Sequence, residues 1–238
     1  MLNSYNSGRI DFKLFTTEEQ SLSRAVDEID RMTSGAVKAG YVLHCGDALF
    51  TLKFTENVSQ VLIDTVVKSF ITAFKSAIYA EENVSLAQHA VALLKISGLK
   101  LSIAESFTGG GIARAIVGVP GASEVLYEGL VCYDPLAKIR RLGVEKEVIR
   151  EKSVVSREVA CEMAKGLLRS GYCDVCLATT GYASEVKNIP GSQGLCFIAA
   201  GADNRIEVRR YVFKGDRETV METGKNAALF MLCGLLRS

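Results

Sequence analysis

The chain has no tryptophan, only two histidines and only three prolines among its 238 residues. The histidines, His44 and His89, lie outside the stretches that we predict to be strands of an α/β sheet. A Ser-His-Asp triad is therefore not expected, unless His89 folds back toward a site. Two histidines also provide few ligands for zinc, and we expect no metal and no cofactor.

No uncharged run approaches the roughly 18 apolar residues of a membrane span. The N-terminus has no basic region followed by an apolar run, so we expect no membrane partner.

The charges of the chain almost cancel, with 28 Lys and Arg residues against 27 Asp and Glu residues. This balance leaves no excess for binding a polyanion, and we expect no nucleic-acid partner. The seven cysteines are an odd number and are scattered through apolar segments. That usage is typical of the reducing cytoplasm, which is where we expect the protein. Cys173 and Cys176 have the spacing of a redox or half-zinc site, but no second pair accompanies them.

The hydrophobic pattern divides the chain into two parts. Apolar residues make up 48% of the sequence, which is enough for a sizeable core. The polar stretch 81–83 is the best linker candidate, and it places the boundary near residue 82. We predict a small α+β module over residues 1–82 and an α/β domain over residues 83–238.

The first part has the pattern of a helix, two strands and a second helix. Thr17–Gln20 reads as a capping box at the start of the first helix. The stretches 40–44 and 49–54 read as the two strands of a hairpin. This order suggests a KH-like module. A KH domain binds nucleic acid through a Gly-x-x-Gly loop, and no such loop with basic flanks lies between Thr33 and Gly40.

Strand-like apolar stretches alternate with helical patterns in the second part. This alternation predicts an α/β fold of three layers, a sheet with helices on both faces. The expected strands are 99–104, 130–133, 175–180, 194–200 and 206–213.

The most informative segment follows the first of these strands, where Ser106 and Thr108 precede three glycines at 109–111. Glycine lets the backbone approach a ligand, and amides at the start of a following helix point at negative charge. Ser106 is therefore a candidate nucleophile beside an anion site. Alternatively, Ser106 and Thr108 only cap the helix that follows.

A second polar segment, 133–138, follows the second predicted strand. Asp134 suits an N-cap and Pro135 the first helical position, which places Lys138 in the first turn. The helix dipole and burial would both lower the pKa of Lys138, and a neutral lysine can act as a general base. Because a serine nucleophile needs an adjacent base, Ser106 and Lys138 form a candidate pair. Tyr133 either relays a proton, orients the lysine or fills the core. Lys138 by itself is also typical of a solvated surface residue.

Together these segments resemble the C-terminal domain of the CinA family of competence- and damage-inducible proteins, the PncC-type nicotinamide mononucleotide deamidases. The resemblance extends over the whole second part. The first part is similar to the small α+β module that precedes the deamidase in longer members, and we expect the family's larger molybdopterin-binding-like domain to be absent. The matching segments are 104–110, 119–123, 133–138, 155–160, 180–181 and 215–217.

The resemblance implies hydrolysis of nicotinamide mononucleotide to nicotinate mononucleotide and ammonia, without a metal. It makes Ser106 the nucleophile, Lys138 the base and Tyr133 an auxiliary residue. The amides of Thr108, Gly109 and Gly110 would take the phosphate or the developing oxyanion. The other substrate-binding residues would be Ser123, Thr180, Gly181 and Arg217. A pyridine nucleotide is the small-molecule partner that the resemblance implies, and the protein is expected to be a homo-oligomer.

Three features of the sequence depart from the family pattern. The loop Tyr182–Pro190 is shorter than usual and lacks its glycines, so Tyr182 and Glu185 could block the nucleotide pocket or add negative charge to it. Phe107 stands in place of the usual cysteine, and Met221 in place of the usual basic residue. The alternative prediction is a catalytically weakened family member that binds a nucleotide or a protein partner.

Overall fold

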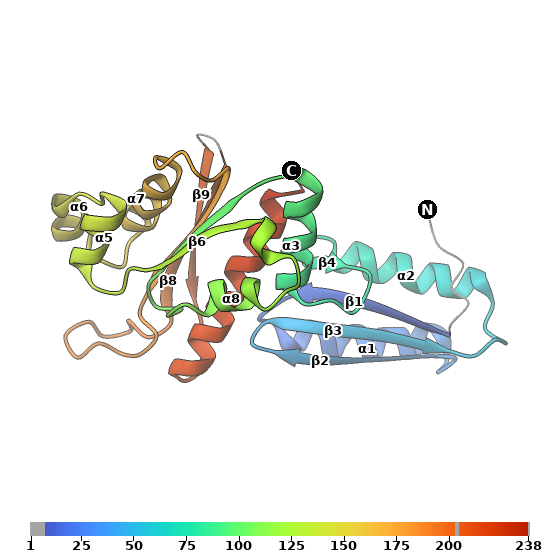
Figure 1. The fold of residues 1–238 in the computed structure, drawn as a ribbon. Coiled ribbons are helices and arrows are strands. Elements are labelled where there is room, and N and C mark those ends of the chain that lie inside the picture. The colour runs from blue at the N-terminus through green and yellow to red at the C-terminus, as the bar shows by residue number, and fades with distance from the viewer. Residues whose placement is uncertain (1–7, 203–204, 238) are drawn as a thin grey trace. The chain divides into compact units, whose positions relative to one another are not determined.

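A computed structural model of the protein describes residues 8–202 and 205–237. The chain divides into two compact units, Met1–Ser85 and Leu86–Ser238. Each unit has its own sheet and its own helices (Figure 1).

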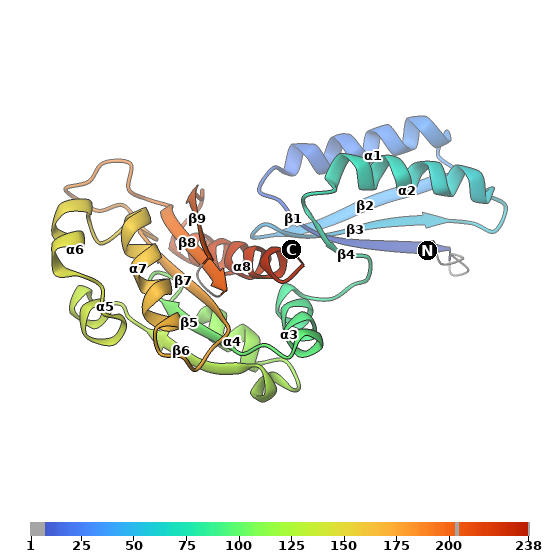
Figure 2. The ribbon, with the colours of Figure 1, turned by 90° about the horizontal axis from the view of Figure 1, so that it is seen from above.

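The first unit is a four-stranded antiparallel sheet with two helices on one face (Figure 2). The strand order is β2-β3-β1-β4. The α+β class is confirmed, and the element order β-α-β-β-α-β is that of a ferredoxin-like fold, not of the KH-like module that we expected. The elements are β1 (Arg9–Phe15), α1 (Glu19–Thr33), β2 (Val37–His44), β3 (Asp47–Phe54), α2 (Gln60–Phe74) and β4 (Ile78–Ala80).

Two strands of this sheet, β1 and β4, are missing from our sequence-based prediction. In β1, Ile10, Phe12 and Leu14 are buried and alternate with polar residues, which is the pattern of a strand with one buried face. The period-two pattern was therefore present in the sequence. Strand β4 has only three residues, too few for a periodic signal, and it forms by pairing with β1. These two strands account for the change from a KH-like to a ferredoxin-like order.

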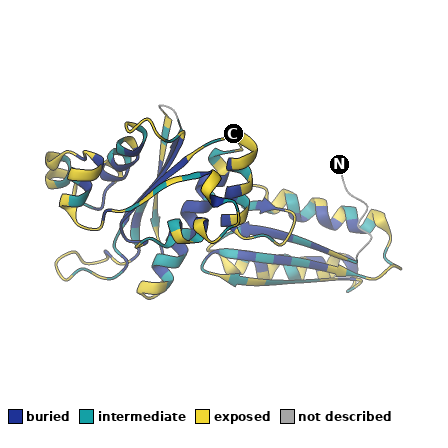
Figure 3. Cartoon of the chain, in the orientation of Figure 1, coloured by how far each residue is buried: buried dark blue, intermediate teal, exposed yellow. Residues whose placement is uncertain are grey.

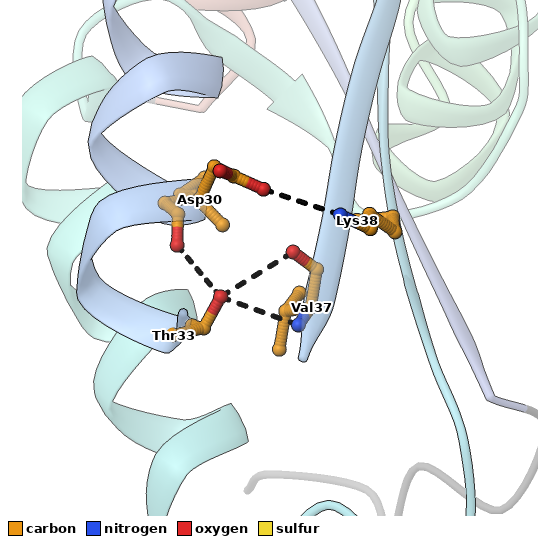
Figure 4. Close-up of polar contacts among 5 residues, drawn as sticks. Asp30, Thr33, Val37 and Lys38 are labelled. Atoms are coloured by element: carbon orange, nitrogen blue, oxygen red, sulfur yellow. Dashed lines mark hydrogen bonds and ion pairs between the residues drawn. The ribbon is translucent and has the colours of Figure 1, made fainter. Parts of the chain in front are cut away.

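The ends of α1 are stabilised differently from the expected capping box. The N-cap is Glu18, whose side chain makes no capping hydrogen bond, so the prediction that Thr17 opens the helix is wrong. At the other end, Thr33 Oγ1 donates to Ile29 O (2.8 Å) and accepts from Val37 N (3.2 Å), which ties α1 to the start of β2 (Figure 4). Lys38 on β2 adds a salt bridge of 3.3 Å to Asp30 on α1.

The second unit contains a five-stranded mixed sheet in the order β6-β5-β7-β8-β9. Strand β5 runs parallel to β6 and β7, and β8 is antiparallel to both β7 and β9. The five predicted strands are present, but β6 begins four residues earlier than expected, so Cys132 and Tyr133 follow it. The strands are β5 (Leu101–Glu105), β6 (Leu126–Val131), β7 (Val175–Gly181), β8 (Leu195–Ala202) and β9 (Arg205–Val212).

Helices cover both faces of this sheet, as the α/β prediction requires (Figure 2). One face carries α3 (Leu86–Ser97), α4 (Gly111–Val117) and α8 (Arg217–Leu235). The other carries α7 (Arg157–Leu168), with α5 (Pro135–Leu142) and α6 (Lys146–Lys152) beside it. Figure 3 shows the buried residues concentrated in the strands and on the inward helix faces. All five residues of β5 are buried. Within the described ranges, no helix combines the length and apolar character needed to cross a bilayer.

Candidate active site

Ser106 lies at the carboxyl end of the buried central strand β5, where the chain turns into α4. Gly109 and Gly110 adopt left-handed backbone angles in this turn, with φ values of 63° and 95°. These angles favour glycine over residues with a Cβ, which explains the glycines of the motif. The Ser106 side chain is almost completely buried, with 6% of its residue surface exposed.

Lys138 reaches the same place from α5. Asp134 caps this helix by accepting a hydrogen bond from Leu136 N (2.7 Å), and Pro135 occupies its first turn, as predicted. Because β5 and β6 are parallel, their carboxyl ends meet at one edge of the sheet, and the residues that follow them lie together. Lys138 Nζ lies 3.0 Å from Ser106 Oγ, within the hydrogen-bond distance expected for the pair.

The ammonium group of Lys138 makes two further hydrogen bonds, both to backbone carbonyls. Its Nζ donates to Cys132 O (2.7 Å) and to Tyr133 O (3.1 Å). When Lys138 is neutral, two N–H bonds remain for these carbonyls, and the nitrogen lone pair is left for the hydroxyl of Ser106. This arrangement of the two carbonyls would allow a neutral Lys138 to accept the proton of Ser106.

Burial is the main influence on the protonation of Lys138. Only 1% of the residue surface is exposed, and this burial lowers its pKa to about 8, against smaller opposing effects of Cys132 and Asp134. In the described part of the chain, no carboxylate lies within ion-pairing distance of the Lys138 ammonium. A substantial fraction of the lysine is therefore neutral in mildly alkaline solution.

Thr179, which our prediction did not include, contacts the Ser106 turn from the neighbouring strand β7. Its Oγ1 lies 2.9 Å from Thr108 Oγ1 and accepts from Ser106 N at 3.4 Å. Thr180, which was expected to bind substrate, instead donates to Val154 O (2.8 Å). Successive strand residues point to opposite faces, so Thr179 and Thr180 cannot both face the turn. The alternation along β7 was the sequence signal for choosing between them.

Glu105 occupies backbone amides that we expected to bind an anion. Its buried carboxylate accepts hydrogen bonds from Gly110 N (3.0 Å), Ile112 N (3.1 Å) and Ala113 N (2.8 Å) at the start of α4. The amide of Gly109 donates to Ser106 O at 3.1 Å. The amides of Gly109 and Gly110 are therefore taken, and the expected anion site is reduced to the amide of Thr108.

Phe107 is held between two glycines on different elements. A Cβ at Gly181 on β7 would lie 2.9 Å from Phe107 Cδ1, and one at Gly224 on α8 would lie 2.4 Å from Phe107 Cζ. Both distances are shorter than normal carbon contacts, so the ring requires glycine at both positions. Gly181, expected as a substrate-binding residue, thus provides the space for the side chain next to Ser106.

Tyr133 and Arg217 meet at the edge of the site. The Tyr133 carbonyl accepts from Lys138, but its phenol points elsewhere and accepts from Arg217 Nη2 at 3.2 Å. Arg217, at the start of α8, also donates to Ser184 Oγ at 3.4 Å. Among the described residues, the Tyr133 phenol has no hydrogen bond to Ser106 or Lys138. The contact between Tyr133 and Lys138 is therefore made by the Tyr133 backbone carbonyl and not by the phenol.

A family model described as the CinA C-terminal domain matches residues 83–236, a range that contains Ser106, Lys138 and Arg217. The chain belongs to the CinA family. A CinA-like protein of Geotalea daltonii is 35% identical over 217 residues, which cover 85% of this chain and 51% of the relative. The chain spans about half the length of the curated relatives it matches.

Two solved CinA structures resemble this chain. The competence/damage inducible protein CihA of Agrobacterium tumefaciens is 31% identical with a TM-score of 0.61, covering 64% of this chain and 94% of that one. The competence or damage-inducible protein of Enterobacter asburiae is 29% identical with a TM-score of 0.60, covering 65% and 99%. These likenesses support the α/β architecture of the CinA domain described above.

Ser123 lies away from the other CinA motif residues in this structure. It belongs to the 3-10 helix Ala122–Glu124, directly before β6, whereas Ser106 and Lys138 follow the ends of β5 and β6. Leu101, the first residue of β5, pairs with Leu126, the first residue of β6. Ser123 therefore lies at the amino ends of these parallel strands, whereas Ser106 and Lys138 lie at their carboxyl ends. Helix α4 carries the chain back across the sheet, which is why two serines of one motif set lie apart.

The loop that departs from the CinA pattern folds on itself. The Glu185 carboxylate accepts from Gly191 N (2.6 Å) and Gln193 N (3.0 Å), and these hydrogen bonds lower its pKa. The Tyr182 phenol lies 3.2 Å from Ser153 Oγ. Both side chains thus have partners inside the protein. The carboxylate of Glu185 therefore accepts hydrogen bonds from amides of its own loop.

Cys173 and Cys176, the redox-like pair, do not form a metal cluster. Cys176 is fully buried in β7, and burial raises the pKa of its thiol to about 12. Where the chain is described, no three His, Cys, Asp or Glu side chains are grouped to hold a metal ion. Cys176 is a core residue, and Cys173 is a partly buried residue packed against the same core.

Proposed function

We propose that this CinA domain is an amidohydrolase that converts nicotinamide mononucleotide to nicotinate mononucleotide and ammonia. The observation that carries the proposal is the pair formed by Ser106 Oγ and Lys138 Nζ, 3.0 Å apart in a buried site, with a lysine pKa of about 8. A buried serine beside a lysine of lowered pKa is an arrangement that activates a nucleophile. The names of the matched relatives state no reaction, so the proposal rests on this geometry and on the family resemblance.

The reaction would proceed in two stages. Neutral Lys138 removes the proton from Ser106 Oγ while the oxygen attacks the carboxamide carbon, and the tetrahedral intermediate collapses as the C–N bond breaks. The leaving nitrogen takes the proton from the Lys138 ammonium and departs as ammonia. In the second stage, neutral Lys138 removes a proton from water as the water oxygen attacks the acyl-serine. The ester C–O bond then breaks, Ser106 Oγ takes the proton from the Lys138 ammonium, and the carboxylic acid product loses its remaining proton to solvent.

The amides that follow Ser106 are suited to stabilise the oxyanion of this intermediate. Within the described chain, the amides of Phe107 and Thr108 have no hydrogen-bond acceptor, whereas those of Gly109 and Gly110 are occupied. The packing of Phe107 between Gly181 and Gly224 holds this short segment in place. A preorganised donor at an oxyanion typically contributes about 3 kcal/mol to transition-state stabilisation.

The test is to incubate the full chain with nicotinamide mononucleotide and to measure ammonia and nicotinate mononucleotide. Ser106→Ala and Lys138→Met are expected to lower kcat by at least about a thousandfold, because each removes a member of the reacting pair. Lys146→Met makes the same change at an exposed lysine of α6 and should leave kcat within about twofold of the parent. Turnover in Ser106→Ala equal to that of the parent would exclude the pair.

A nucleotide-binding protein without turnover is the second candidate. The compact, glycine-poor loop after Gly181 favours it, because this loop differs from the family pattern next to Arg217. The outcome that selects it is a higher melting temperature of the parent with nicotinamide mononucleotide, together with no release of ammonia.

A further inference from the structure

An open pocket of about 440 Å³ adjoins the glycine turn, between α4 and the first half of α8. Residues 108–111 of the turn form one side of it. The other lining residues are mostly charged: Arg114, Arg217, Glu218, Met221, Glu222 and Lys225. The pocket therefore lies next to the proposed nucleophile and carries cationic groups from two helices.

Two of the three cations in this lining, Arg114 and Arg217, form no ion pair with the described residues. Lys225 forms an ion pair with Glu222 on the same helix. Among the described residues, the hydrogen bonds of the Arg217 side chain go to the neutral hydroxyls of Ser184 and Tyr133. For Arg114, the described residues provide no side-chain hydrogen bond and no ion pair. With Lys225 and Glu222 paired, Glu218 is the remaining carboxylate against two guanidinium groups, and the lining is net positive.

The backbone amides at the start of α4 are not available to hold a second anion in this pocket. Glu105 already accepts from three amides at the start of α4 at 2.8 to 3.1 Å. A phosphate placed there would compete with this buried carboxylate and would meet its negative charge. An anionic group on a substrate whose amide lies at Ser106 would instead find its counter-charges at Arg114 and Arg217.

We propose that Arg114, together with Arg217, binds the phosphate of the substrate and makes the enzyme selective for phosphorylated amides over unphosphorylated ones. This inference rests on the proposed amidohydrolase function. A guanidinium group presents a planar set of N–H donors that matches phosphate oxygens, and Arg114 supplies it from α4. Arg114 thereby provides a second guanidinium group in the pocket, opposite the first half of α8.

The test compares a phosphorylated and an unphosphorylated substrate, nicotinamide mononucleotide and nicotinamide riboside. Arg114→Gln is expected to lower kcat/KM for the mononucleotide roughly tenfold to hundredfold, the range of one or two hydrogen bonds to a charged group. The same variant should leave kcat/KM for the riboside unchanged. Arg150→Gln, at an exposed arginine of α6, is the matched control and should change neither value. An equal loss on both substrates, or no loss on either, overturns the proposal.

If the proposed amidohydrolase function is wrong, the parent protein will turn over neither nicotinamide mononucleotide nor nicotinamide riboside. Calorimetric titration with ribose 5-phosphate then tests the pocket directly. Binding to the parent that is weakened tenfold or more in Arg114→Gln, and not in Arg150→Gln, supports the phosphate site without the reaction. Absence of binding to the parent, or equal binding to the parent and Arg114→Gln, overturns it.

Discussion

The burial of Lys138 predicts a stability that rises with pH in the alkaline range. The folded protein has a Lys138 pKa of about 8, whereas the ordinary lysine value of 10.5 applies to the unfolded chain. Between these two values the unfolded state holds a proton that the folded state has released. The free energy of unfolding therefore increases as pH rises through this window. The reason is that burial is unfavourable for the protonated lysine and not for the neutral one.

The magnitude follows from the two pKa values. From pH 7 to pH 10, the contribution of Lys138 to the free energy of unfolding should rise by about 2.5 kcal/mol. Other groups also titrate in this range, so the parent must be compared with Lys138→Met, in which this contribution is absent. The difference in unfolding free energy, parent minus variant, should increase by the same amount.

Urea unfolding followed by far-ultraviolet circular dichroism measures this difference without requiring a known substrate. The chain has no tryptophan, so indole fluorescence is not available as a probe. Lys146→Met, at an exposed lysine, should show no such pH dependence relative to the parent. If the difference between the parent and Lys138→Met stays constant from pH 7 to pH 10, Lys138 does not have a lowered pKa, and its proposed role as a base loses its physical support.

Other predictions concern the residues around the Ser106 turn. Glu105→Gln should lower the free energy of unfolding by about 2–4 kcal/mol in urea titrations, because its amide group cannot accept from three N–H donors; an unchanged midpoint would contradict this. Gly224→Ala should destabilise by about 1–3 kcal/mol, and adding Phe107→Leu should restore part of the loss. Thr179→Val should lower kcat more than Thr180→Val in the deamidation assay, and equal effects would refute the assignment of Thr179 to the turn.

The regular elements of the second unit could largely be predicted from the sequence. Apolar stretches with strand character marked β5 and β7, because these strands are buried and need continuous hydrophobic residues. The start of α5 was equally clear, since Asp134 and Pro135 act through local hydrogen bonding and local backbone geometry. The hairpin of β2 and β3 in the first unit was also predicted, from the alternation of apolar and polar residues along its strands. Local chemistry of this kind depends on neighbouring residues only, and it can be read without knowing the fold.

The sequence was less informative where an element depends on distant partners. Strand β4 forms because β1 lies beside it, and β6 begins earlier than its most apolar residues because Leu126 pairs with Leu101 of β5. Ser123 illustrates the same limit. Helix α4 lies between the segments that contain Ser106 and Ser123, and it places the two serines at opposite ends of the parallel strands.

The sequence by itself determined the fold class, the family and the two side chains of the candidate pair, because residue type and local pattern carry that information. Only the tertiary structure decided that Ser106 and Lys138, 32 positions apart, lie 3.0 Å from each other. It also decided that Glu105 caps the helix whose amides were expected to bind an anion, and that Thr179 rather than Thr180 faces the turn. The physical reason is that side-chain direction and burial are set by the packing of strands and helices from the whole unit, and these in turn set distances and pKa values.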